Sequence, residues 1–219
     1  MHPAPDTLAG KTRVRPGNPK VSRQDWLAAA RGLLISRGVE DVKILSLSAQ
    51  LGVARSSFYW YFDSRADLLS ALLAEWELRN TQCILEKCDL PAGGVTEALC
   101  HFFECFVDPG LFDPGLDFAV REWARRDAAV RAKIDAADQS RLDALIALFE
   151  RHGFAPYEAD ARARIVYFMQ LGYHALEVNE SMETRMTRLE GYLSGFTGAA
   201  ADPSAVAVFK ARVLDPVAP

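Results

Sequence analysis

Apolar residues recur at helical spacing along most of this chain, with Gly, Pro and short polar runs between the periodic segments. The clearest stripe lies in residues 95–106, where apolar side chains fall three and four positions apart and so share one helix face. No segment sustains the alternation of apolar and polar residues that is typical of a half-buried strand. The pattern predicts an all-α protein of about nine or ten helices.

Capping and turn residues predict where these helices begin and end. Ser22 and Ser64 each stand three positions before an Asp, which is typical of a helix start. Gly38, Gly52 and Gly153 follow periodic segments and are suited to helix ends. The expected helices cover residues 22–37, 44–51, 54–63, 64–88, 95–106, 116–126, 127–152, 158–178 and 182–197, with a last short one from 203.

Composition places the chain among globular proteins. It has 219 residues, 50% of them hydrophobic and 25% charged. No apolar run approaches the ~18 residues of a membrane span, and the first residues, Met1 to Asp6, contain no apolar core of a secretory signal. We therefore expect a cytoplasmic protein whose four Cys are free thiols.

Charge is distributed unevenly along the chain. Residues 1–65 contain ten Lys or Arg and five Asp or Glu, whereas the remaining residues contain 15 basic and 24 acidic ones. A basic N-terminal part on an acidic body favours contact with a polyanion at the N-terminal end only. We expect a mobile basic arm over residues 1–20, a helix-turn-helix domain over 21–65 and a helical body over 66–219.

The helix expected at 54–63 has an unusual outer face. Ala54, Phe58 and Phe62 share one side and can pack inward. The opposite arc then presents a run of hydroxyl, aromatic and guanidinium groups, which suits a DNA groove because such groups bind phosphates, thymine methyls and guanine edges. Trp60 or Tyr61 could instead pack beneath another element. The residues of this arc are Arg55, Ser56, Ser57, Tyr59, Trp60 and Tyr61.

Residues 51–69, from Leu51-Gly52-Val53 through the aromatic run to Arg65, resemble the DNA-binding motif of the TetR family of transcriptional regulators. The similarity extends over about residues 22–80. It implies an N-terminal three-helix DNA-binding domain, joined through a long fourth helix to a C-terminal ligand-binding and dimerisation bundle. This sequence has Arg65 where the family often has Lys, and Tyr61 where it often has His.

The resemblance implies a role for each residue of the motif. Base edges or thymine methyls would be contacted by Arg55, Ser56, Tyr59 and Trp60. Phosphates would be held by Ser57, Tyr61 and Arg65, and Arg65 also stands in the first turn of a helix, whose N–H groups attract an anion. Lys43 is a candidate backbone contact, although an ordinary solvated lysine explains it equally well.

The body offers weaker signals. Candidate ligand contacts are His101, Phe102, Phe106, Trp123, Phe168 and His174, although most such residues must belong to the core. The two residues of each Cys pair, 83/88 and 100/105, stand five positions apart, which is poor geometry for a metal. Buried free thiols are the favoured interpretation, and sensing through thiols or a soft metal is the minority alternative. We expect no metal, no cofactor and no catalytic motif, hence no enzyme.

Residues 165–176 are apolar on nearly all sides, so both faces of that helix need cover. A second copy of the chain would supply it, giving a two-fold dimer that involves the helix at 182–197. A tail over 200–214 folded back on the same chain would be the alternative.

These observations predict a dimeric, ligand-responsive transcriptional regulator, a repressor released from a palindromic operator by a small apolar or aromatic ligand. Two other classes remain open: an architectural DNA-binding protein with little sequence preference, and a helical ligand-binding protein or enzyme whose DNA domain has no regulatory role.

Overall fold

The computed structural model describes residues 21–215, and every regular element in that range is helical. The predicted arm over residues 1–20 lies outside the described residues. The N-terminal elements are α1 (Arg23–Arg37), η1 (Val39–Asp41), α2 (Ile44–Leu51), η2 (Arg55–Trp60) and α3 (Arg65–Trp76). The others are η3 (Glu77–Gln82), α4 (Cys83–Asp89), α5 (Val95–Val107), α6 (Pro114–Ala124), α7 (Ala128–Arg151), α8 (Pro156–Ala175), α9 (Met182–Thr197) and α10 (Pro203–Leu214).

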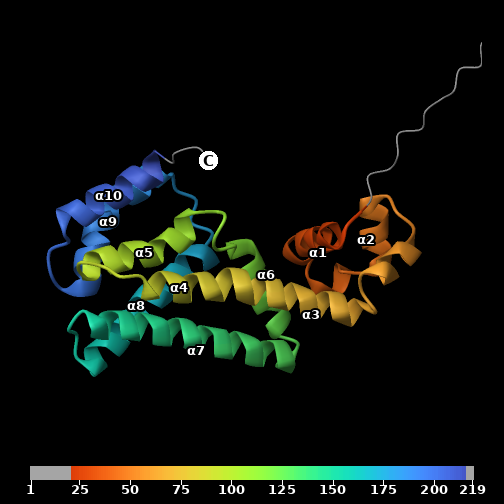
Figure 1. The fold of residues 1–219 in the computed structure, drawn as a ribbon, viewed down its shortest axis with the longest axis horizontal. Coiled ribbons are helices and arrows are strands. Elements are labelled where there is room, and N and C mark those ends of the chain that lie inside the picture. The colour runs from red at the N-terminus through yellow and green to blue at the C-terminus, as the bar shows by residue number, and fades with distance from the viewer. Residues whose placement is uncertain (1–20, 216–219) are drawn as a thin grey trace, which may run out of the picture.

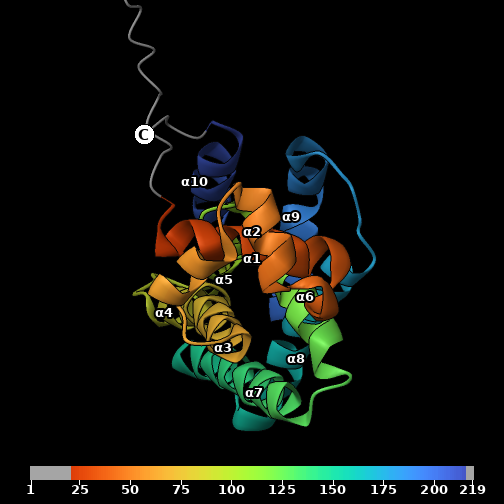
Figure 2. The same ribbon diagram turned by 90° about the vertical axis from the view of Figure 1, so that its right-hand side faces the viewer.

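The molecule is elongated, with α1 and α2 at one end and the bundle of α5 and α7 to α10 at the other (Figure 1). A continuous helical run from α3 through α4 extends from the first part into the second, and α7 runs alongside it. Viewed from the N-terminal end, α1 and α2 lie in front of the bundle (Figure 2). The predicted all-α class with its long connecting helix is confirmed.

Most predicted helix ends are confirmed. They could be predicted because they depend on hydrogen bonds between residues close in sequence. Ser22 and Asp25 form a reciprocal capping box at α1, and Ser64 accepts a hydrogen bond from the backbone of Asp67 at α3. Gly52 adopts the left-handed conformation after α2, with φ of 67°. In contrast, α6 and α8 each begin two residues before the predicted start, at a Pro in the first turn.

Two predicted helices differ in their local form. Residues 55–60 form a 3₁₀-helix instead of an α-helix, and Ala54 is an exposed capping residue with extended backbone, so it does not share the buried face with Phe58. The long helix expected to run to Cys88 contains a π-helical segment, η3, at its middle. The wider π-turn places Asn80 and Thr81 in buried positions.

The apolar core has two parts. The first part is formed by the helices from α1 through α3, together with α6 and the first half of α7. Trp26, Phe58 and Trp76 lie at its centre. The second fills the bundle around Phe102, Phe149 and Tyr167. Residues of α6 and α7 belong to the N-terminal core, so the N-terminal helices pack continuously against helices that follow residue 65. The domain boundary predicted at residue 65 stays a prediction.

The outer face of α8 is open. Ile165 is 57% exposed and Phe168 52% exposed, and Leu176 just after the helix is more exposed still. The alternative that residues 200–214 cover this face is wrong, because α10 packs on α5 and α9. Between residues 21 and 215, no helix has the length and apolar character needed to cross a membrane.

Candidate nucleic-acid interface and bundle cavity

The short helix η2 is held from beneath by two phenylalanines. Phe58 and Phe62 are buried and stack with their ring centroids 5.4 Å apart. The edge of Phe58 also meets Trp26 of α1 at 5.3 Å. Because these aromatic contacts anchor Phe58 and the residue two positions after η2, the outer edge of η2 has a defined direction.

That outer edge presents the predicted base-contacting side chains. Tyr59 is 59% exposed and Trp60 75% exposed, and Arg55 and Ser56 are exposed beside them. Arg55 makes no ion pair with any residue between 21 and 215. Two exposed aromatic rings next to an unpaired guanidinium suit contact with sugars, thymine methyls and guanine edges.

The predicted phosphate contacts have intramolecular partners that the sequence did not indicate. The hydroxyl of Ser57 donates to Ala54 O at 2.7 Å, and that of Tyr61 donates to Val21 O at 2.7 Å. Tyr61 is therefore half-buried, as the alternative expectation allowed. A hydroxyl that donates within the protein can still accept, but a phosphate needs a donor, so these two phosphate roles stay predictions.

Arg65 also has a structural role. Its Nε donates to Val42 O and its Nη2 to Val39 O, both at 2.6 Å, which fixes the loop after α1 to the start of α3. Lys43 is exposed at the start of α2, with Asp41 3.9 Å away. Sequence reasoning missed Arg23, whose guanidinium lies 4.8 Å from the centre of the Phe62 ring.

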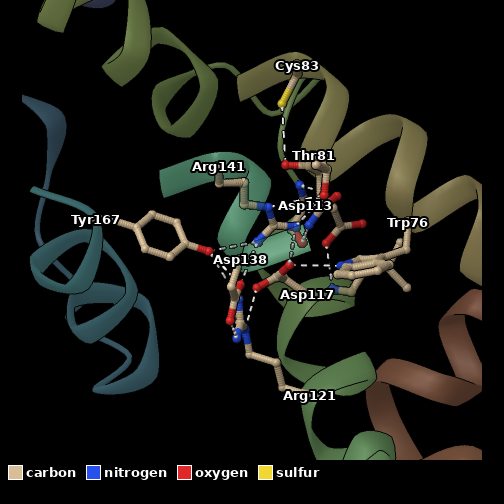
Figure 3. Close-up of polar contacts among 11 residues, drawn as sticks. Trp76, Thr81, Cys83, Asp113, Asp117, Arg121, Asp138, Arg141 and Tyr167 are labelled. Atoms are coloured by element: carbon tan, nitrogen blue, oxygen red, sulfur yellow. Dashed lines mark hydrogen bonds and ion pairs between the residues drawn. The ribbon is translucent and has the colours of Figure 1, made fainter. Parts of the chain in front are cut away.

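A buried polar network lies where α3 meets α6 and α7 (Figure 3). Trp76 Nε1 donates to Oδ1 of Asp117 at 2.8 Å, and Arg141 Nη2 donates to the same oxygen at 3.1 Å. Burial acts to raise the pKa of Asp117, but the charges of Arg141 and Arg121 outweigh it, so the pKa is lowered and the carboxylate is ionised.

The network extends on both sides of this ion pair (Figure 3). On the π-helical side, Arg141 donates to Thr81 Oγ1 from Nε and Nη2, at 3.1 and 2.9 Å. On the other side, Arg121 makes a two-point contact with Asp138, to which Tyr167 of α8 also donates at 2.7 Å. The last turn of α3 is thus connected by hydrogen bonds to α6, α7 and α8.

A cavity of about 50 Å³ lies between α5, α8, α9 and α10. One of the predicted ligand contacts lines it, and two more pack against its lining residues without reaching it. Phe106 lines it, and Phe102 is buried behind Phe106 with ring centroids 5.1 Å apart. His174 adjoins it through Gln170, whose Nε2 lies 2.8 Å from His174 Nε2. Burial lowers the pKa of His174, which keeps the imidazole neutral near pH 7.

The other three predicted ligand contacts lie elsewhere. His101 lines a separate hollow beside Glu97 and Arg212, Trp123 lines one between α1 and α6, and Phe168 is on the open face of α8. The six residues therefore do not form one site. Gln170 and Arg185 also line the cavity and were not predicted, although Gln170 is a polar residue inside an apolar stretch of the sequence.

All four cysteines are buried and free. Cys105 lies near Cys83, with its Sγ 3.4 Å from Cys83 O. Burial raises the pKa of Cys88 and of Cys100 to about 12, so these thiols stay protonated at neutral pH. No group of His, Cys, Asp and Glu among residues 21–215 is arranged to hold a metal.

The fold and the exposed edge of η2 define the class of helix-turn-helix proteins. Residues 27–72 match the family model of bacterial regulatory proteins, tetR family. The resemblance seen in the sequence is therefore confirmed over residues 27–72, which are similar to the N-terminal domain of TetR-family regulatory proteins.

Among the relatives is the uncharacterized HTH-type transcriptional regulator TtgW of Pseudomonas putida, which is 33% identical over 55 residues. That match covers 25% of this chain and 41% of the relative, so the chain spans less than half of TtgW.

Among solved structures, Mycobacterium smegmatis AmtR superposes with a TM-score of 0.61 at 21% identity, over 94% of this chain and 99% of that chain. Escherichia coli NemR in its reduced form superposes with a TM-score of 0.56 at 19% identity, over 83% and 98%. These likenesses show that the chain shares its fold with these two proteins over most of its length.

Proposed function

We propose that this chain is a sequence-specific, dimeric DNA-binding transcriptional regulator, a repressor that binds a palindromic operator and is released by a small apolar or aromatic ligand. The observation that supports it most is the outer edge of η2, where exposed Arg55, Tyr59 and Trp60 stand on buried Phe58. Exposing two large aromatic side chains on one short helix is costly in water and favourable against a DNA groove.

Phosphate contacts around this edge would fix the protein on the duplex. Our candidates for them are Ser57 within η2, Tyr61 directly after it, Arg65 at the start of α3 and Lys43 at the start of α2. Arg65 would act partly by holding η1 against α3, since two of its nitrogens already donate to backbone carbonyls.

The open face of α8 supports a dimer. Ile165, Phe168 and Gly172 follow one another at helical spacing on that face. In α9, Gly191 and Gly195 are exposed and have no neighbouring atom within 4 Å of the place where a side chain would begin. Glycine inside a helix is unfavourable by roughly 1 kcal/mol, and close approach of a second chain would explain its presence. Two recognition helices in such a dimer would read half-sites about 34–36 Å apart.

Ligand control is supported by the route between the cavity and α3. His174, next to the cavity, stacks on Phe112 with centroids 6.0 Å apart. Arg141 lies over Phe112 at 5.8 Å and also over Trp76 at 5.4 Å. A ligand that binds better to a rearranged bundle would act on the position of α3 through these contacts, by a coupling of typically ~1–3 kcal/mol.

A selection of random duplexes on the purified protein at near-physiological salt tests this function. We expect one inverted repeat to be enriched, and the Tyr59→Ala/Trp60→Ala double variant to lose that enrichment. Arg131→Gln, a change of an exposed arginine on α7, should behave as wild type. Binding that fades with salt and enriches no sequence would favour an architectural DNA-binding protein. If the protein bound no duplex at all, the function would have to lie in the helical bundle, as in a ligand-binding protein or enzyme.

A further inference from the structure

The cavity between α5, α8, α9 and α10 is apolar over most of its wall. Phe103 and Phe106 line it from α5, Met186 and Leu189 from α9, and Phe209 from α10. Its volume of about 50 Å³ is far below the ~300–1,000 Å³ that a typical ligand pocket provides. A ligand of more than a few atoms must therefore widen it, and flexible side chains such as Met186 favour such widening.

The cavity has one charged side chain among its lining residues in the described part of the chain, namely Arg185 of α9. Arg185 is half-buried, and its guanidinium lies 4.8 Å from the centre of the Tyr173 ring. It forms no ion pair within residues 21–215, whereas Arg188 one turn later pairs with both oxygens of Glu180. Tyr173 also donates to Glu180, so this carboxylate is already engaged.

Because Arg185 is half-buried it keeps part of its hydration, and the Glu180 carboxylate acts on it through charge and not through a direct ion pair. Its guanidinium donors are therefore available to an incoming anion. Its planar donors match a carboxylate better than a neutral group. Helix α8 adds a polar group to the lining, Gln170, which is almost fully buried. Its Nε2 is engaged with His174 Nε2, so Arg185 is left as the charged group at this cavity that can donate to an anion.

We propose that this cavity binds a small organic monoanion, with its apolar body between the phenylalanines and methionines and its carboxylate on Arg185. This inference rests on the proposed function only for the consequence of binding: the same contacts that admit the ligand displace Gln170 and His174, and through Phe112 the position of Arg141. Binding itself depends on the cavity alone.

The test compares acids with alcohols that have the same apolar part: benzoate with benzyl alcohol, and octanoate with octanol. Binding is measured by titration calorimetry on the full chain without DNA. We expect at least one acid to bind about tenfold or more tightly than its alcohol, the factor that corresponds to about 1.4 kcal/mol. Arg185→Gln should remove that preference and leave alcohol binding unchanged. Arg131→Gln, the matched exposed arginine, should keep it.

Equal affinity for acid and alcohol, a preference that survives in Arg185→Gln, or no binding of any probe would overturn the proposal. Circular dichroism of Arg185→Gln excludes simple unfolding as the cause of a loss. DNA affinity is measured separately on the same samples. An acid that binds through Arg185 without changing DNA affinity would contradict the proposed regulation by ligand. It would still support the proposal that the cavity binds a small organic monoanion.

Discussion

Trp76 donates its indole N–H to the carboxylate of Asp117 at 2.8 Å, and this bond joins the last turn of α3 to α6. The same carboxylate is the counter-ion of Arg141, and both charged side chains are fully buried. Because the two charges compensate one another out of water, the contact between the N-terminal helices and the bundle depends on keeping both.

Asp117→Asn should therefore destabilise the protein strongly. Removing the carboxylate charge leaves Arg141 buried without its full compensation, which costs about 3–5 kcal/mol. Urea unfolding followed by tryptophan fluorescence measures the loss, and Asp135→Asn, at an exposed ion pair on α7, is the matched control with an expected change under about 1 kcal/mol. Equal stability of the two variants would contradict a structural role for the network.

Acid should weaken the protein through the same group. Burial alone would raise the pKa of Asp117, but Arg141 and Arg121 reverse that effect and the folded-state pKa lies below its ordinary value of about 3.9. Such a carboxyl contributes stability that is fully present above the unfolded-state pKa and is lost as pH falls through the folded-state pKa. We expect the urea midpoint to decline below about pH 4, less steeply in Asp117→Asn than in Asp135→Asn. Parallel declines would assign the acid sensitivity to other groups.

The parts of the structure that the sequence predicted are those that depend on local interactions. The serine caps and glycine ends require only residues a few positions apart, so Ser22, Ser64 and Gly52 were identified directly. The exposed aromatic edge of η2 also follows from spacing, since Phe58 and Phe62 must be buried together.

The parts that could not be predicted depend on contacts between distant residues. Arg65 reads as a surface cation at a helix start, yet its donors reach carbonyls 23 and 26 positions away. The π-turn becomes favourable through Asn80, which exchanges hydrogen bonds with the backbone of Asp113 across 33 positions. The cavity residues come from four helices, and a helical pattern alone does not say which faces meet.

The proposed dimer predicts that a charge on the open face of α8 separates the subunits. Phe168→Glu would place a carboxylate in the proposed interface, where desolvation without a partner is costly. Sedimentation should give the mass of one 24.2 kDa chain for this variant and twice that for the wild type. Val208→Glu, at an exposed apolar residue of α10, should stay dimeric. A wild-type protein that sediments as a monomer at micromolar concentration would refute the dimer.

Neighbouring aromatic residues of η2 should behave in opposite ways. Phe58→Ala should destabilise the N-terminal core by about 3–5 kcal/mol, because it leaves a cavity against Trp26. Trp60→Ala should change stability by no more than about 0.5 kcal/mol while lowering affinity for the selected duplex. Thermal unfolding and fluorescence anisotropy separate the two effects. Loss of stability in Trp60→Ala would mean that its ring packs within the protein.

The two arginines at the candidate interface should affect DNA binding differently. Arg55→Ala should leave stability unchanged and relax the preference at one base pair by about 1–3 kcal/mol, as expected for a contact to a guanine edge. Arg65→Ala should weaken binding to all duplexes alike and also cost about 1–3 kcal/mol of stability, because two backbone carbonyls lose their donors. Anisotropy titrations with the selected duplex and with single-base variants, alongside urea unfolding, measure both quantities. Uniform weakening by Arg55→Ala would reassign it to the phosphates, and full stability of Arg65→Ala would contradict its role in holding η1 against α3.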